Sequence, residues 1–172
     1  FASGGRRRSE IARLRVEDIV EEPPVQARPG KEDGPLLPCL SLRLGRTKTA
    51  NADDDAKVYL VGRPVVALRD WLARAGIDQG AVFRSINKWG QLGRAMTPQS
   101  VNLILKARIV RAGLDPAEFS AHGLRSGYLT EAARKGVPLP EAMAQSQHRS
   151  VAQAARYYND AERRSGRAAR LV

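Results

Sequence analysis

The stretch at residues 120–136, SAHGLRSGYLTEAARKG, has the marks of an amphipathic helix at both of its ends. Ser120 can accept a hydrogen bond from the first turn, and Gly136 suits the left-handed conformation that ends many helices. Apolar residues recur between them at helical spacing: Leu124, Tyr128, Leu129, Ala132 and Ala133. His122 and Arg125 stand three residues apart, so they share a face beside this stripe. The stretch predicts a helix that places two polar side chains at the edge of a core.

Further helices are predicted on both sides of this stretch. The same kind of start and stop residues bound two of them: Pro64 to Gly76 and Pro98 to Gly113. Another helix is predicted in SEIARLRVEDI, with Ser9 as its cap. Three short helices are predicted to finish the chain: around 140–147, 150–158 and 160–171.

Two stretches between the first helices are typical of β-strands. LLPCLSLRLG alternates in part, and KVYLVG follows it after a polar turn, so the pair predicts a small antiparallel hairpin. The preceding EEPPVQARPGKEDGP is rich in proline and glycine and predicts an exposed loop. The sequence therefore predicts a mainly α protein with a small antiparallel β-sheet (α+β), as a single domain over residues 1–172.

Charge and composition limit the class of partner. The 172 residues carry 29 Lys and Arg against 18 Asp and Glu, a net charge of +11. That excess indicates a polyanionic partner, most often nucleic acid, with a merely soluble basic surface as the alternative. One cysteine, Cys39, and two histidines exclude a disulfide framework and a zinc site of the usual ligand spacing, and Cys39 is expected in the core or a strand. No apolar run approaches the ~20 residues of a membrane span.

Two more stretches carry residues suited to phosphate chemistry. GGRRRSE puts three arginines at the start of a predicted helix, where an anion would be attracted, although a solvated basic face is the alternative. SQHRSVAQAARYYND holds His148, Tyr157 and Tyr158. A tyrosine hydroxyl can attack phosphorus, but its pKa near ~10 means that it needs positive charge around it. Arginine forks match phosphate oxygens, a lysine can protonate a departing oxygen, and no step requires a metal.

In order and spacing, these motifs resemble the catalytic domain of the tyrosine recombinases, also called the phage integrase family, and Cre-type members most of all. GRRRSEIARLRVEDI is similar to the first arginine box, and LGRTKT to the Cre-type hairpin. HGLRSG is similar to the second box, and QHRSVAQAARYY to the third. The resemblance implies a set of catalytic residues: Arg7, Lys48, His122, Arg125, His148 and Tyr157, with Glu10 in support.

The resemblance also implies a mechanism that uses no cofactor or metal. Tyr157 would attack the scissile phosphate, which forms a 3′-phosphotyrosyl bond and frees a 5′-hydroxyl. Arg7 and Arg125 would stabilise the transition state, and Lys48 would protonate the leaving oxygen. The two histidines would hydrogen-bond the phosphate or assist proton movement. Glu10 would support the arginine or histidine side chains.

Spacing separates the two neighbouring tyrosines. Tyr157 lies nine residues after His148, as the family has it, whereas Tyr158 is one residue too far. Neighbours on a helix also point ~100° apart, so both cannot face one phosphate. Tyr158 is therefore expected to pack or to contact the backbone.

Two positions and one missing domain depart from the family's pattern. Arg6 stands where the family usually has an apolar residue, and Gln147 where it has a glycine. The family's N-terminal core-binding domain is missing, so the chain is expected to be the C-terminal part of a longer protein. Residues 160–172 are expected to form an exchange tail that docks into a neighbouring protomer.

The resemblance implies double-stranded DNA as the partner, with self-association to a tetramer on it, and neither a small-molecule substrate nor a membrane. A cytoplasmic, nucleoid-associated protein of bacterial or phage origin is expected. Three alternatives stay open. A type IB topoisomerase uses similar tyrosine chemistry, but LGRTKT and HGLRSG favour a recombinase. A non-catalytic DNA-binding relative would lack one of the catalytic residues, and a basic RNA-binding module would use an aromatic platform.

Overall fold

The helix predicted at residues 120–136 is present as α4 (Ala121–Arg134) in the structure, a computed structural model that describes residues 4–28, 30, 34–44 and 57–165. The Ser120 side chain accepts a hydrogen bond from the Gly123 amide at 2.9 Å, and Gly136 has a φ of 71° just beyond the helix. Both ends therefore lie where the sequence predicts them.

The chain divides into two compact units. One comprises Ser9–Thr97 and is called the sheet unit; the other comprises Phe1–Arg8 with Pro98–Val172 and is called the helical unit. The single domain that the sequence predicts stays a prediction.

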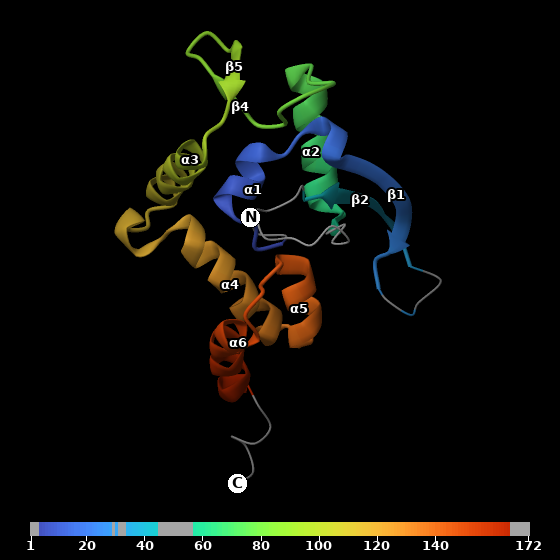
Figure 1. The fold of residues 1–172 in the computed structure, drawn as a ribbon, viewed down its shortest axis with the longest axis vertical. Helices are drawn as coiled ribbons and strands as arrows, with labels where there is room; N and C mark the ends of the chain where they lie inside the picture. Colours follow the sequence, from blue (N-terminus) through green and yellow to red (C-terminus); the bar gives the residue numbers. More distant parts are fainter. Residues whose placement is uncertain (1–3, 29, 31–33, 45–56, 166–172) are drawn as a thin grey trace. The chain divides into compact units, whose positions relative to one another are not determined.

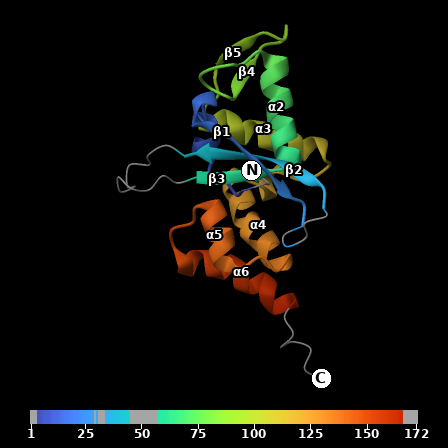
Figure 2. The same cartoon turned by 90° about the vertical axis from the view of Figure 1, so that its right-hand side faces the viewer.

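The helical unit is built around α4. Its other elements are α3 (Pro98–Arg111), a 3₁₀ turn (Pro116–Glu118), α5 (Leu139–Ser146) and α6 (Val151–Ser165). Helices α5 and α6 pack beside α4 (Figure 1), as the turned view also shows (Figure 2). Their shared core is made of small and branched residues: Leu129, Ala132, Ala142 and Ala154, with Tyr157 packed against it. Alanines at the contact let the helix backbones approach closely, which places the start of α4 beside the end of α5.

Helix α6 corrects one prediction. Two short helices were expected at 150–158 and 160–171, but a single helix runs through both ranges as far as Ser165. The physical reason is that no glycine or proline occurs between residues 150 and 165, so nothing interrupts the hydrogen-bond ladder. Asn159 and Asp160 are weak helix formers but are tolerated inside a helix whose apolar face is packed.

The prediction of a helix near the N-terminus is confirmed, but the prediction that Ser9 caps it is wrong. Helix α1 spans Arg8–Arg13, so Ser9 lies within its first turn. A 3₁₀ turn at Val16–Asp18 follows. Gly5, with a φ of 56°, precedes the helix in the left-handed conformation.

The sheet unit contains the predicted hairpin and one strand more. Strands β2 (Leu36–Arg43) and β3 (Lys57–Val61) pair antiparallel, as expected, and β1 (Ile19–Gln26) pairs with the other side of β2. The predicted loop EEPPVQARPGKEDGP was therefore wrong in its first half. Pro23 and Pro24 are accommodated because β1 is an edge strand whose pairing shifts between Glu22 and Val25.

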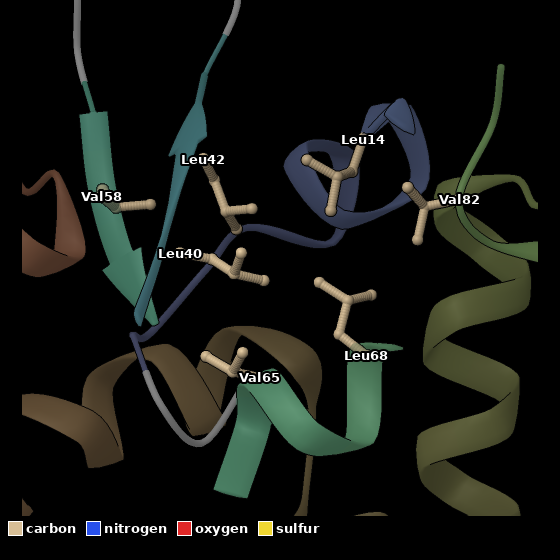
Figure 3. Close-up of a cluster of buried hydrophobic side chains, with 7 residues drawn as sticks. All are labelled: Leu14, Leu40, Leu42, Val58, Val65, Leu68 and Val82. Carbon is tan, nitrogen blue, oxygen red and sulfur yellow. The ribbon is translucent and has the colours of Figure 1, made fainter. Parts of the chain in front are cut away.

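Helix α2 (Arg63–Ala75) covers this sheet and starts and stops as predicted, with Pro64 in its first turn and Gly76 in the left-handed conformation. Figure 3 shows the core between them, formed by Leu14, Leu40, Leu42, Val58, Val65, Leu68 and Val82. Cys39 is buried in β2, as expected, and burial raises the pKa of its thiol. A second hairpin, β4 (Arg84–Ile86) with β5 (Leu92–Ala95), was not predicted.

Two features are absent from the described residues. No described helix is long and apolar enough to cross a membrane. No group of three His, Cys, Asp or Glu side chains among the described residues could hold a metal ion.

Candidate active site

Arg125 is a buried cation at the centre of the helical unit. Its side chain extends from α4 and the residue is only 5% exposed. One terminal nitrogen, Nη1, donates to the carbonyl oxygens of Gly5 at 2.7 Å and Ser146 at 2.6 Å, and Nη2 donates to that of Gln147 at 2.9 Å. The guanidinium thus ties the N-terminal segment and the end of α5 to α4. These three carbonyl oxygens hold it in place.

Arg6 and Arg7 have different surroundings. Arg6 is buried, and its Nε and Nη2 donate to the Gly4 carbonyl at 3.1 and 3.0 Å, while Nη2 also donates to the carbonyl of Gln145. Arg7 is exposed. The arginine at the family's apolar position therefore holds the N-terminal segment against α5. Arg7 remains the candidate for contact with a phosphate.

Gly5 occupies a position where a side chain would be strained, next to the Arg125 side chain that its carbonyl contacts. Its φ of 56° is left-handed, and a Cβ built there would lie 3.1 Å from the Tyr128 ring. The close approach to α4 is what brings the Gly5 carbonyl to Arg125.

His148 lies in the turn between α5 and α6 and is surrounded by positive charge. Its Nδ1 is 2.6 Å from Ser146 Oγ. Burial, followed by the charges of Arg125, Arg7, Arg6 and His122, lowers the pKa of His148 from 6.5 to about 4. The ring is therefore neutral at pH 7. The same charges show that three other predicted site residues lie within electrostatic range of His148: Arg7, His122 and Arg125.

This lowered pKa makes stability depend on pH. The unfolded state binds more protons than the folded state between pH 6.5 and about 4, because only the unfolded ring keeps its ordinary pKa. The free energy of unfolding is therefore expected to fall as the pH drops through that window, by on the order of 1 kcal/mol after allowance for solvent screening. Above it, this group adds no pH dependence.

Urea denaturation of the wild type and of His148→Gln, each at about pH 7 and pH 4.5, measures the effect. The variant should lose less stability on acidification than the wild type does. Equal losses in the two proteins would contradict the lowered pKa.

The two tyrosines on α6 have different environments. Tyr158 is buried, 7% exposed, and its hydroxyl donates to the Val137 carbonyl. Tyr157 is half-buried against the core of the helical unit, and its backbone carbonyl accepts from Thr130 Oγ1 of α4 at 3.4 Å. Within the part of the chain that the structure describes, the Tyr157 hydroxyl has no hydrogen-bond partner. The expectation that Tyr158 packs and contacts the backbone is confirmed.

The remaining predicted site residues are less fully placed. His122 is exposed in the first turn of α4, one turn before Arg125. Glu10 lies in α1, within the sheet unit. Lys48 lies outside the described residues, as does the end of the predicted tail 160–172. Their roles stay predictions.

Gln147 stands where the family has a glycine, and it adopts the backbone conformation that glycine favours. It ends α5 in the left-handed conformation, with φ 56° and ψ 42°. A side chain there costs about 1–2 kcal/mol, partly offset by its smaller freedom in the unfolded chain.

Gln147→Gly is therefore expected to raise the free energy of unfolding by about 0.5–1 kcal/mol while the carbonyl at this position still accepts from Arg125. Urea denaturation measures the change. Gln145→Gly, which introduces glycine inside α5, is the matched control and should lower stability. A loss of stability in Gln147→Gly would contradict the cost assigned to this conformation.

Comparison with known proteins places this chain in a family. A family model described as "Phage integrase family" matches residues 1–164. The chain belongs to the phage integrase family, so the family prediction is confirmed. The particular likeness to Cre-type members within it stays a prediction.

Individual relatives agree with this assignment. An "Integrase/recombinase xerD homolog" from Selenomonas ruminantium is 37% identical over 94 residues, which cover 54% of this chain and 28% of that protein. The solved structure of XerH recombinase bound to palindromic difH substrate, a post-cleavage complex, matches with a TM-score of 0.69 and 20% identity, over 99% of this chain and 43% of that one. XerA recombinase matches with a TM-score of 0.62 and 17% identity, over 99% and 54%.

These structural likenesses show the fold and confirm the predicted class, mainly helical with small antiparallel sheets. The chain spans less than a third of the curated relative and about half of the solved structures it matches.

Proposed function

We propose that this chain carries the catalytic centre of a site-specific DNA recombinase that cleaves and rejoins duplex DNA through a tyrosine. The observation that carries the proposal is the cluster in the helical unit. Arg7, His122 and Arg125 surround His148 electrostatically, and Tyr157 lies on a helix packed against α4. A neutral, uncharged site would be the ordinary outcome of core packing, so gathered cations favour an anionic ligand.

Each residue has a role in the proposed reaction. The Tyr157 hydroxyl gives its proton to a histidine of the site, His122 or His148, as its oxygen bonds to the scissile phosphorus. The bond from phosphorus to the 5′-oxygen breaks, and the leaving oxygen takes a proton from Lys48. Arg7 and Arg125 hold the non-bridging oxygens and stabilise the charge of the transition state. The bond energy is kept in the 3′-phosphotyrosyl link, which a 5′-hydroxyl reverses during rejoining.

Double-stranded DNA is the proposed partner, supported by the net charge of +11. Two of the similar structures are complexes with nucleic acid: XerH with its difH substrate, and the Tn1549 transposon integrase with transposon right end DNA, the latter with a TM-score of 0.56 and 15% identity. A tetramer on DNA, linked by the tail at 160–172, and a nucleoid-associated place in the cell belong to the same proposal.

A type IB topoisomerase would use the same covalent chemistry, so the two functions are separated by their products. A plasmid with two copies of the target site, found by selecting bound DNA, is incubated with the protein. Exchange between the sites supports recombination. Relaxation of supercoils without exchange would support the topoisomerase instead.

The proposed role of Lys48 has its own test. Lys48→Ala is expected to slow cleavage of an ordinary phosphodiester by roughly 100-fold or more, because its leaving oxygen needs a proton. Cleavage of a 5′-bridging phosphorothiolate should slow far less, since sulfur leaves without one. Single-turnover rates on both substrates measure this, and Lys57→Ala is the matched control. Equal slowing of both substrates by Lys48→Ala would indicate binding rather than proton transfer.

A further inference from the structure

Ser146 links two of the site residues, although nothing in the sequence singled it out. It is the last residue of α5 and is fully buried, with 0% exposure. Its backbone carbonyl accepts from Arg125 Nη1 at 2.6 Å. Its hydroxyl oxygen lies 2.7 Å from the Ala142 carbonyl oxygen and 2.6 Å from His148 Nδ1.

These two hydroxyl contacts fix the direction of both hydrogen bonds. A serine hydroxyl has one proton, and a carbonyl oxygen can only accept. The hydroxyl of Ser146 therefore donates to Ala142 and must accept from His148. It follows that Nδ1 of His148 carries a proton.

A neutral imidazole has a single N–H, so the other ring nitrogen is then an acceptor. His148 is neutral at pH 7 in this surrounding, which also holds Arg125, Arg7, Arg6 and His122. In the protein without DNA, its Nε2 is therefore unprotonated. The sequence left two roles open for this histidine: a hydrogen bond to the phosphate, or assistance in proton movement. Both would use Nε2, because Nδ1 is held by Ser146.

We propose that Ser146 is a positioning residue, whose hydroxyl fixes the Nδ1–H tautomer of His148 and so leaves Nε2 as the ring nitrogen available to the catalytic centre. The catalytic meaning rests on the function proposed above.

Nuclear magnetic resonance reads the tautomer directly. Long-range ¹H–¹⁵N correlation spectra of the 172-residue chain at pH 7 distinguish a protonated ring nitrogen from an unprotonated one. The chain has two histidines, so the His122→Asn variant assigns the signals. The wild type should show the proton of His148 on Nδ1. Ser146→Ala should move population to the Nε2–H form, and Ser146→Thr, which keeps the hydroxyl, should restore the wild-type pattern.

Ser150→Ala is the matched control, because its hydroxyl accepts from the Gln153 amide at 3.2 Å and does not contact His148. It should leave the tautomer unchanged. If Ser146→Thr is too large for its buried site, the comparison of Ser146→Ala with Ser150→Ala still decides the question. A wild-type ring protonated on Nε2, or an unchanged tautomer in Ser146→Ala, overturns the inference.

The rate of covalent adduct formation on DNA tests the catalytic part. Ser146→Ala should slow it by roughly 10- to 100-fold and alter its pH profile, with DNA affinity unchanged. A changed tautomer with an unchanged rate overturns the positioning role. A wild type that forms no adduct refutes the proposed function instead, and the tautomer measurement stands apart from that result.

Discussion

Replacing Tyr157 by phenylalanine is expected to abolish the covalent DNA adduct, whereas replacing Tyr158 should leave it in place. The two side chains differ in what their hydroxyls do. Tyr158 is buried and donates to the Val137 carbonyl of its own unit. Using it as a nucleophile would remove that bond and withdraw the ring from the core. Tyr157 is half-buried, and its hydroxyl is not committed to another described residue.

A nicked suicide substrate, which traps the intermediate, measures the adduct on a denaturing gel. Tyr157→Phe should give no adduct while retaining DNA binding. Tyr158→Phe should lower the free energy of unfolding by about 1 kcal/mol, the usual value of a lost hydrogen bond, and keep the adduct. An adduct in Tyr157→Phe that disappears in Tyr158→Phe would reverse the assignment.

Arg125→Ala is expected to have the second largest effect, since it removes a structural support together with a proposed catalytic charge. Three carbonyls would lose their hydrogen bonds from Arg125: those of Gly5 and Ser146, which are buried, and that of Gln147, which is part-buried. Hydrogen bonds from a charged group are worth about 1.5–3 kcal/mol each and are not additive, so a loss of about 3–5 kcal/mol is expected. Arg125→Lys should recover little, because one ammonium cannot reach three carbonyls as a guanidinium does.

Arg7→Ala is the matched control for this prediction. Arg7 is exposed, so its replacement should change stability by less than about 0.5 kcal/mol while abolishing cleavage. Urea denaturation and adduct formation, measured on both variants, separate the two contributions. If Arg125→Ala is as stable as Arg7→Ala, the carbonyl contacts do not support the fold.

Helices α4 and α2 could be predicted because their ends are marked locally. Ser120 and Gly136 bound α4, and Pro64 and Gly76 bound α2, within one or two residues of the structure. The strand β1 could not be predicted in this way, because Pro23 and Pro24 argue against a strand unless the neighbouring strand is known. Only the pairing of β1 with β2 shows that they fall at an edge and at a shift in register.

The candidate site was predictable where the motif itself names the residue, and not where a contact across the fold defines the role. His122, Arg125, His148 and Tyr157 follow from the boxes. In the sequence, Arg6 was only a departure from the family's apolar residue. Its role could not be predicted, because the Gln145 carbonyl that it contacts is 139 positions away in the chain. Ser146 gave no signal at all, since one serine two residues before a histidine is commonplace until the hydroxyl is seen at Nδ1.

The central claim is that Tyr157 forms the bond to DNA, and mapping that bond tests it most directly. Trypsin cleavage after Arg156 and Arg163 yields the peptide YYNDAER, which contains both candidate tyrosines. The trapped adduct is digested with trypsin and nuclease, and tandem mass spectrometry locates the remaining nucleotide. The account predicts a 3′-linked nucleotide on the first tyrosine of this peptide, Tyr157. A nucleotide on Tyr158, or on a peptide outside this segment, would contradict it.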